Sequence, residues 1–452
     1  MQKIKYIGIS LCTLLFTQCE VQYNDFKPSN GEADFTTFVA LGDSYTAGYT
    51  DGALGKKGQE NGFSYILAKQ LEQVGSTGFI QPLVESEKSV GSTEIAPGVM
   101  NGYYELQGSG SSLTPVPTVG DMGIFTERVY DANGPVQNLG VPGAKVSHLL
   151  APGYGTMNPY FWRFASDAAS TSVVADAIAQ NPTFVSLWIG GNDVLTYALA
   201  GGEADEITAP EAFGQYMQTV AASLFSNGTK GVIANVPDIN DLPYISTIPY
   251  NALFIDKATA DLLNAAYAQY NVASDMMGLP KIEFKSGFNA LVIADEEYAH
   301  PGKIRQIKAG EKVLLPALSS IKNSEIGWGS KVAIPEDYVL DETEIAGIAT
   351  ATVAYNNTIK AIANSQDYNL AFVDLNALMN KVSNEVFVVD GIEYTSTFVT
   401  GGVFSLDGIH ATGRGSAIIA NEFIKAINEK YNCNIPEAAV NEYSAVEFPD
   451  VE

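Results

Sequence analysis

Short apolar runs alternate with amphipathic stretches along most of the chain. Runs rich in β-branched and aromatic residues predict five buried strands, at residues 35–41, 135–139, 183–189, 231–236 and 370–375. Apolar residues at helical spacing predict helices at residues 63–74, 173–180, 211–225, 251–277, 344–364 and 415–431. Strands that alternate with helices form parallel sheets covered on both faces, so the pattern predicts an α/β fold.

Two stretches depart from that alternation. Residues 281–340 hold short strand-like pieces broken by Gly and Pro, which predict a small β or α+β subdomain within an insertion over residues 241–344. This insertion either caps a functional site or is a surface decoration. Residues 75–133 are rich in Gly, Ser, Pro and Tyr, with little helical period, which predicts loops over the site. Three aromatic residues there either line a substrate groove or anchor the loops: Tyr103, Tyr104 and Phe125.

The N-terminal end reads as an export signal over residues 1–18. Two lysines precede an apolar run at residues 7–16, which is too short to span a membrane. Cys19 stands where a bacterial lipoprotein carries its lipid, although the preceding Gln18 is larger than is usual there. An ordinary cleaved secretion signal is the alternative. The protein is therefore expected to be exported and lipid-anchored to a bacterial membrane (outer membrane or cell surface), or else periplasmic or secreted.

The two ends of the mature chain are polar. Residues 19–34 predict a tether, and residues 433–452, which are acidic and contain two prolines, predict a loosely attached tail. Besides Cys19, the mature chain keeps only Cys433, so it has neither a disulfide framework nor a cysteine-rich zinc site. Its stability must come from a packed core.

The chain is strongly acidic, with 25 Lys and Arg against 51 Asp and Glu and a net charge of −26. Nucleic acids and anionic lipid surfaces require a basic patch, so neither is an expected partner, and membrane contact is expected through the lipid anchor only. The same balance favours solubility and neutral or weakly charged substrates.

Candidate chemistry follows the first predicted strand and reappears near the C-terminus. Gly42 ends that strand and brings Asp43 and Ser44 into a tight turn, one way to hold a nucleophilic hydroxyl, although these are also ordinary turn residues. Far downstream, Asp407 and His410 are three positions apart, a spacing at which the carboxylate reaches the imidazole. A serine nucleophile needs such a base, and the base needs such a carboxylate to fix its tautomer.

Together these segments resemble the GDSL, or SGNH, family of serine hydrolases, in which a G-D-S block supplies the nucleophile and a D-x-x-H block the acid and base. Two further blocks of that family have counterparts here, N-L-G-V-P-G at residues 138–143 and W-I-G-G-N-D at residues 188–193. All four blocks fall at or just after carboxyl ends of predicted strands, where ligands bind in parallel sheets.

The resemblance implies a role for five residues. Ser44 is the expected nucleophile, His410 the general base and then acid, and Asp407 the carboxylate that orients the histidine. The backbone N–H groups of Ser44 and Gly143, with the side-chain amide of Asn192, are the expected oxyanion hole. His300 lacks an acid at the D-x-x-H spacing and is not expected to be catalytic.

The resemblance also implies a fold and an activity. The fold is a flavodoxin-like three-layer sandwich with a central parallel sheet, formed by residues 35–240 and 345–432. The activity is cleavage of carboxylic esters through an acyl-serine, without metal or cofactor, on a small-molecule ester (esterase or lipase) or an acetylated carbohydrate. An α/β-hydrolase is excluded, because Thr46 stands where the G-x-S-x-G motif requires glycine. A non-catalytic surface lipoprotein that binds a glycan or a partner on this fold is the alternative.

Overall fold

The computed structural model describes residues 26–84, 87, 89–110 and 113–449. The predicted export signal and Cys19 lie outside the described residues, so both stay predictions. None of the described helices combines the length and the hydropathy that a membrane-spanning helix needs.

Five parallel strands form the central sheet, as the sequence predicted. Their order across the sheet is β16 (Ala371–Val373), β9 (Lys230–Ala234), β8 (Phe184–Trp188), β1 (Phe38–Gly42) and β7 (Asn138–Gly140). Every residue of β1 and β8 is buried, as expected for strands that are covered on both faces. The carboxyl ends of β1, β7 and β8 lie side by side, since Gly42 is in register with Gly140 and with Trp188.

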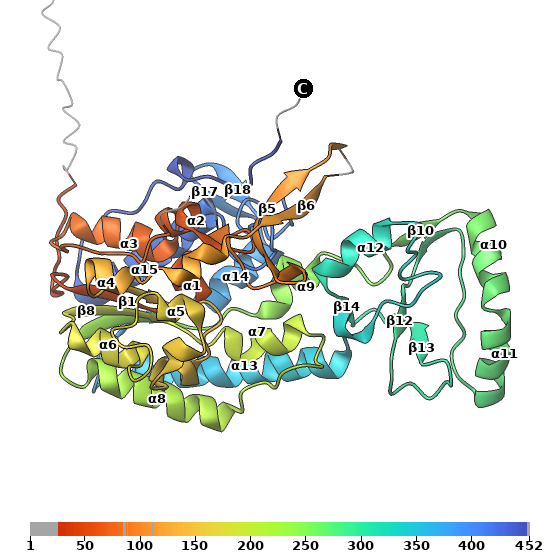
Figure 1. The fold of residues 1–452 in the computed structure, drawn as a ribbon, viewed down its shortest axis with the longest axis horizontal. Helices are drawn as coiled ribbons and strands as arrows, with labels where there is room; N and C mark the ends of the chain where they lie inside the picture. Colours follow the sequence, from red (N-terminus) through yellow and green to blue (C-terminus); the bar gives the residue numbers. More distant parts are fainter. Residues whose placement is uncertain (1–25, 85–86, 88, 111–112, 450–452) are drawn as a thin grey trace, which may run out of the picture.

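Helices cover both faces of this sheet and confirm the α/β sandwich. Figure 1 shows α3 (Phe63–Glu72) and α15 (Gly413–Tyr431) on one side, and α6 (Val173–Ala179), α8 (Pro210–Phe225) and α13 (Glu342–Ala363) on the other. Their apolar residues join the strands in one continuous core. In α15, which corresponds to the helix predicted at residues 415–431, one face is buried against this core, through Ile418, Ile419, Phe423 and Ile427.

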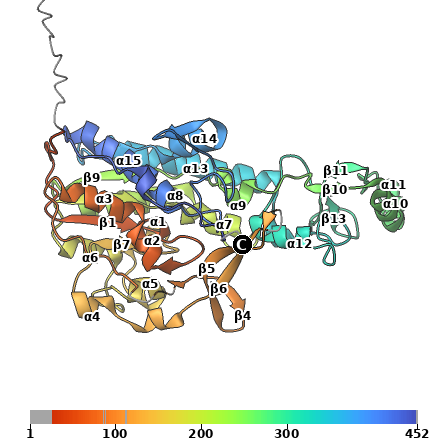
Figure 2. The same ribbon diagram turned by 90° about the horizontal axis from the view of Figure 1, so that it is seen from above.

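Between β9 and β16, the chain that precedes α13 forms a lobe that extends beyond the end of the sheet (Figures 1 and 2). It has α+β character, with helices α10 (Lys257–Ala266), α11 (Ala268–Met277) and α12 (Leu318–Lys322). Three antiparallel strand pairs accompany them: β10–β11 (Leu253–Ile255, Gly287–Asn289), β12–β13 (Val292–Ala294, Ile304–Gln306) and β14–β15 (Lys312–Val313, Val339–Leu340). The lobe has apolar clusters of its own, but Leu314 and Leu340 belong to the main core. It is therefore built into the domain rather than attached to its surface.

The expectation of loops over residues 75–133 is wrong for much of that segment. Strands β4 (Glu94–Ala96), β5 (Val99–Gln107) and β6 (Thr114–Val119) form a three-stranded antiparallel sheet. The prolines Pro115 and Pro117 hid β6 from the sequence pattern. They are tolerated because β6 is an edge strand, paired only with β5.

The C-terminal segment is also better ordered than expected, because it packs along α15. Ile435, Ala438 and Val440 are buried, and Asn421 and Asn428 hydrogen-bond to its backbone. The prediction of a loose tail is therefore wrong for residues 433–440. The described end of the predicted tether is held here too, since the backbone of Ser29 pairs with that of Asn434.

Candidate active site

Ser44 is presented by a tight turn at the carboxyl end of β1. It is the first residue of the short helix α1 (Ser44–Ala47), which Asp43 caps by accepting a hydrogen bond from the Tyr45 N–H at 3.0 Å. Glycine is required just before this turn, since a Cβ on Gly42 would lie 2.1 Å from the Thr46 hydroxyl. Glycine at 140, on the neighbouring strand, is required for the same reason: a Cβ there would lie 2.2 Å from the Ala47 nitrogen.

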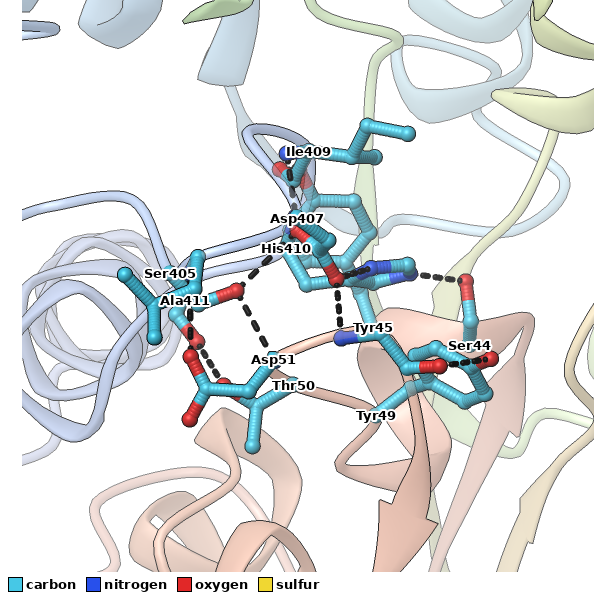
Figure 3. A network of polar contacts seen from close by, with 12 residues as sticks. Ser44, Tyr45, Tyr49, Thr50, Asp51, Ser405, Asp407, Ile409, His410 and Ala411 are labelled. Atoms are coloured by element: carbon cyan, nitrogen blue, oxygen red, sulfur yellow. Dashed lines mark hydrogen bonds and ion pairs between the residues drawn. The ribbon is translucent and has the colours of Figure 1, made fainter. Parts of the chain in front are cut away.

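The structure brings Ser44, His410 and Asp407 together. His410 Nε2 lies 2.8 Å from Ser44 Oγ, and His410 Nδ1 lies 2.7 Å from Asp407 Oδ2 (Figure 3). The imidazole is buried between the rings of Tyr45 and Tyr49, whose centroids lie 5.2 and 4.7 Å from its own. The ring is thus held with one nitrogen on the serine and the other on the carboxylate, as the resemblance implied.

Asp407 is tied down by more than the histidine. Its Oδ2 also accepts the Gly52 N–H at 2.8 Å, while Oδ1 accepts the Ser405 hydroxyl and the N–H groups of Ile409 and His410. Burial alone would raise the pKa of Asp407, but the nearby His410 imidazole and the N–H groups of Ile409 and His410 hold it well below its usual range. Asp407 is therefore a fixed negative charge beside the imidazole at any physiological pH.

A second set of contacts latches the Asp407–His410 loop onto residues 50–52 (Figure 3). The Ser405 hydroxyl accepts the Asp51 N–H at 3.0 Å and donates to Asp407, and the Asp51 carboxylate accepts the Leu406 N–H at 2.9 Å. The Thr50 hydroxyl donates to the Ala411 carbonyl at 2.9 Å. The sequence analysis missed these residues. No local signal marks them, because the partners are more than 350 positions apart.

The three expected oxyanion donors lie around one cavity with Ser44. Gly143 has a left-handed backbone (φ 77°), and in the described chain neither its N–H nor that of Ser44 donates to a protein acceptor. Asn192 begins α7 (Asn192–Leu199), and its side-chain amide donates one hydrogen to the Ala144 carbonyl at 3.0 Å. Because the amide carries two hydrogens, one remains for an oxyanion.

Two buried acids support the loops that carry these donors. The Asp193 carboxylate accepts the Val146 N–H at 2.9 Å, which fixes the segment just after Gly143. Burial raises the pKa of Asp193 and of Asp43 to about 6. Both carry their charge at neutral pH but far less firmly than Asp407.

Tyr103, Tyr104 and Phe125 were expected either to line a substrate groove or to anchor loops, and the structure separates them. Tyr104 lines the cavity in front of Ser44. Tyr103 does not; its hydroxyl accepts the Gly58 N–H at 3.1 Å, which makes it a loop anchor. Phe125 packs edge-on against Tyr160, with ring centroids 4.9 Å apart, and lies outside the cavity.

The remaining candidates for chemistry lie elsewhere. His300 is buried in the lobe beside Tyr270 and accepts the Gly302 N–H, so it has a structural role, consistent with the expectation that it is not catalytic. Within the described residues, no group of three or more His, Cys, Asp or Glu side chains is placed to hold a metal ion.

The chain was compared with known proteins. A family model described as GDSL-like lipase/acylhydrolase matches residues 38–286. No curated protein matches the chain. One similar structure is that of LAE5, an alpha/beta hydrolase enzyme from the metagenome of Lake Arreo, Spain (12% identity, 88% of this chain and 96% of that chain covered, TM-score 0.38). Another is a family 3 carbohydrate esterase of Clostridium thermocellum (14% identity, 87% and 96% covered, TM-score 0.30). Because the family model covers more than half of the sequence, the protein belongs to the GDSL-like lipase/acylhydrolase family and is an ester-cleaving hydrolase.

Proposed function

We propose that the protein cleaves carboxylic esters through an acyl-serine intermediate formed on Ser44. The observation that supports this most directly is the continuous hydrogen-bonded chain from Ser44 Oγ through His410 to Asp407, with distances of 2.8 and 2.7 Å. A nucleophile and its base in hydrogen-bond contact, with a third group orienting the base, is the arrangement that activates a serine hydroxyl.

In the proposed reaction, His410 Nε2 takes the hydroxyl proton as Ser44 Oγ bonds to the ester carbonyl carbon. The tetrahedral intermediate collapses, its bond to the alcohol oxygen breaks, and His410 returns the proton to the leaving alcohol. Water then attacks the acyl-serine, with His410 again as base, and the carboxylic acid leaves. Asp407 keeps the imidazole in the required tautomer and stabilises the imidazolium in both halves.

The oxyanion of each tetrahedral intermediate is the proposed ligand of the Ser44 and Gly143 N–H groups and of the Asn192 amide. Negative charge reaches the carbonyl oxygen only as the attack proceeds. Donors that are fixed in advance therefore bind the transition state more strongly than the substrate.

The alternative that differs in its substrate is a carbohydrate deacetylase, which would prefer acetylated saccharides. The test is hydrolysis of p-nitrophenyl acetate by the wild type and by Ser44→Ala. Equal rates for the two proteins would contradict the proposed function.

Asn192→Ala is expected to lower kcat by about 100- to 1000-fold, because one of three oxyanion donors is lost. KM should change little, since the interaction is made mainly in the transition state. Steady-state kinetics with p-nitrophenyl acetate check this. Asn357→Ala, at an exposed position of α13 outside the cavity, is the control. A loss below threefold would remove Asn192 from the oxyanion hole.

Ser405→Ala is expected to lower kcat by about 10- to 100-fold, because Asp407 loses one of the donors that fix it and small misplacements of catalytic groups are costly. KM should stay constant, as Ser405 does not line the cavity. Ser405→Thr, which keeps the hydroxyl, should recover part of the rate. An equal loss in both variants would indicate that Ser405 only fills space.

A further inference from the structure

Two segments outside the central sheet supply much of the wall around Ser44. The cavity has a volume of about 530 Å³. Strands β5 and β6 contribute Tyr104, Pro115 and Pro117, and the lobe contributes Leu315, Pro316 and Leu318 from α12 and the turn before it. Further apolar surface comes from Leu195 and Leu199 of α7 and from Pro142, Phe398, Leu406 and Ile409.

The side chains around the cavity exclude charge. Asp407, already paired with His410, is the one Asp among the described residues that line it, and no Glu, Lys or Arg does so. The chain has 76 charged residues (25 basic and 51 acidic), so the lining of the cavity is poorer in charge than the sequence as a whole. An ionised substrate group would enter without a counter-charge, at a considerable desolvation cost.

The leucine side of the wall is unsuited to a saccharide, whereas hydroxyls line other parts of the cavity, at Ser92, Thr93, Thr114, Thr196 and Ser319. Sugar hydroxyls that lose water must find hydrogen-bond partners, and each one left unpaired costs binding energy. Leu199, Leu315 and Leu318 offer none, whereas they match the methylene groups of an acyl chain. A cavity of this volume falls in the range of about 300–1,000 Å³ that holds drug-sized ligands, so an acetyl group would leave most of it empty.

Both wall segments are tied to the catalytic loops. The Tyr244 N–H, at the base of the lobe, donates to the Gly408 carbonyl at 2.9 Å, and the Leu315 side chain packs against Gly408. On the other side, the Tyr104 N–H donates to the Asp51 carbonyl at 2.7 Å, and the Tyr104 ring covers Gly52. Contacts to the segments that hold Asp407 and His410 fix the walls relative to Ser44.

We propose that β5–β6 and the Leu315–Leu318 segment of the lobe form the acyl-binding site of this enzyme, and that Leu318 limits the length of the chain it accepts. The substrates are neutral esters with an apolar acyl group of several carbons. The inference rests on the proposed acyl-serine function and names the substrate class for it.

The first test measures kcat/KM for p-nitrophenyl acetate, butyrate and octanoate, below the concentrations at which these esters aggregate. Burying a methylene is worth about fourfold in binding, so we expect butyrate to exceed acetate by roughly tenfold, with a further rise to octanoate. A flat series, or acetylated saccharides hydrolysed faster than octanoate, would overturn the proposal. So would a series of alkyl acetates with the same dependence on length, because the cavity would then hold the alcohol half.

The second test places a larger side chain on the wall. Leu318→Trp should lower the ratio of kcat/KM for octanoate to that for acetate by at least about tenfold, since the indole fills space that a long chain needs. Leu318→Ala should raise the ratio for dodecanoate to octanoate, so that the proposal does not depend on one variant folding. Leu262→Trp, the same substitution at a 73% exposed leucine on α10, should change neither ratio.

Ser44→Ala distinguishes a failure of the proposed acyl-serine function from a failure of the acyl-site assignment alone. If it keeps the wild-type rates, the acyl-serine function fails and the acyl site fails with it. If it abolishes hydrolysis while chain-length ratios are equal in the wild type, Leu318→Trp and Leu262→Trp, the function stands and the acyl-site assignment is wrong.

Discussion

Ser44→Ala is expected to lower kcat for p-nitrophenyl acetate by about 10⁴-fold or more, the loss typical of removing a serine nucleophile. The substitution removes the oxygen that lies 2.8 Å from His410 Nε2, and within the described residues no other hydroxyl hydrogen-bonds to that nitrogen. The fold should be unaffected. Helix α1, which begins at Ser44, is capped by Asp43, and the Ser44 side chain contacts the histidine rather than a structural partner.

The residual activity is informative as well as the loss. Alanine at position 44 keeps the backbone N–H and leaves the Gly143 and Asn192 donors in place, so some acceleration over water should remain. Ser223→Ala, on the exposed face of α8, is the matched control and should keep the full rate. A Ser44→Ala variant that is folded by circular dichroism and still turns over at more than a tenth of the wild-type rate would end the serine mechanism.

The central sheet and its helices could be predicted from the sequence, because local patterns determine these elements. The apolar run before Gly42 predicts a strand that ends in a tight turn, and β1 and α1 have that form. The stripe at Ile418 and Phe423 predicts a helix with one buried face, and α15 is such a helix. In both places propensity, periodicity and burial agree, so one sequence suffices.

What the sequence missed depends on distant partners. Nothing in the sequence distinguishes Ser405 and Asp51 from other polar residues. Only the fold brings the Asp51 N–H to 3.0 Å from the Ser405 hydroxyl oxygen. The edge position of β6 likewise decides whether Pro115 and Pro117 are compatible with a strand, and edge position is a property of the sheet. The position of Leu318 depends on distant partners too, because nothing in an isolated helical turn shows that this residue lines the same cavity as Ser44.

Asp407→Asn is expected to reduce kcat by about 10⁴-fold, because the histidine would be held in the wrong tautomer. The carboxylate now accepts from three donors on Oδ1 and from Gly52 and His410 Nδ1 on Oδ2. Asparagine has one acceptor oxygen, which the three donors around Oδ1 would take. Its NH₂ group would then face Nδ1, which could only accept, so the ring proton would move to Nε2. A protonated Nε2 cannot take a proton from Ser44.

The same substitution has a signature in stability that separates charge from shape. The pKa of Asp407 is depressed in the folded protein, so its ionised form stabilises the fold above the unfolded-state pKa of about 4, and this contribution is lost as the pH falls. The difference in unfolding free energy between wild type and Asp407→Asn should therefore shrink from pH 7 to pH 3. Asp261→Asn, at an exposed position in α10, should keep full activity. A pH-independent difference, or kcat within tenfold of the wild type, would mean that a neutral hydrogen-bond partner is enough to orient His410.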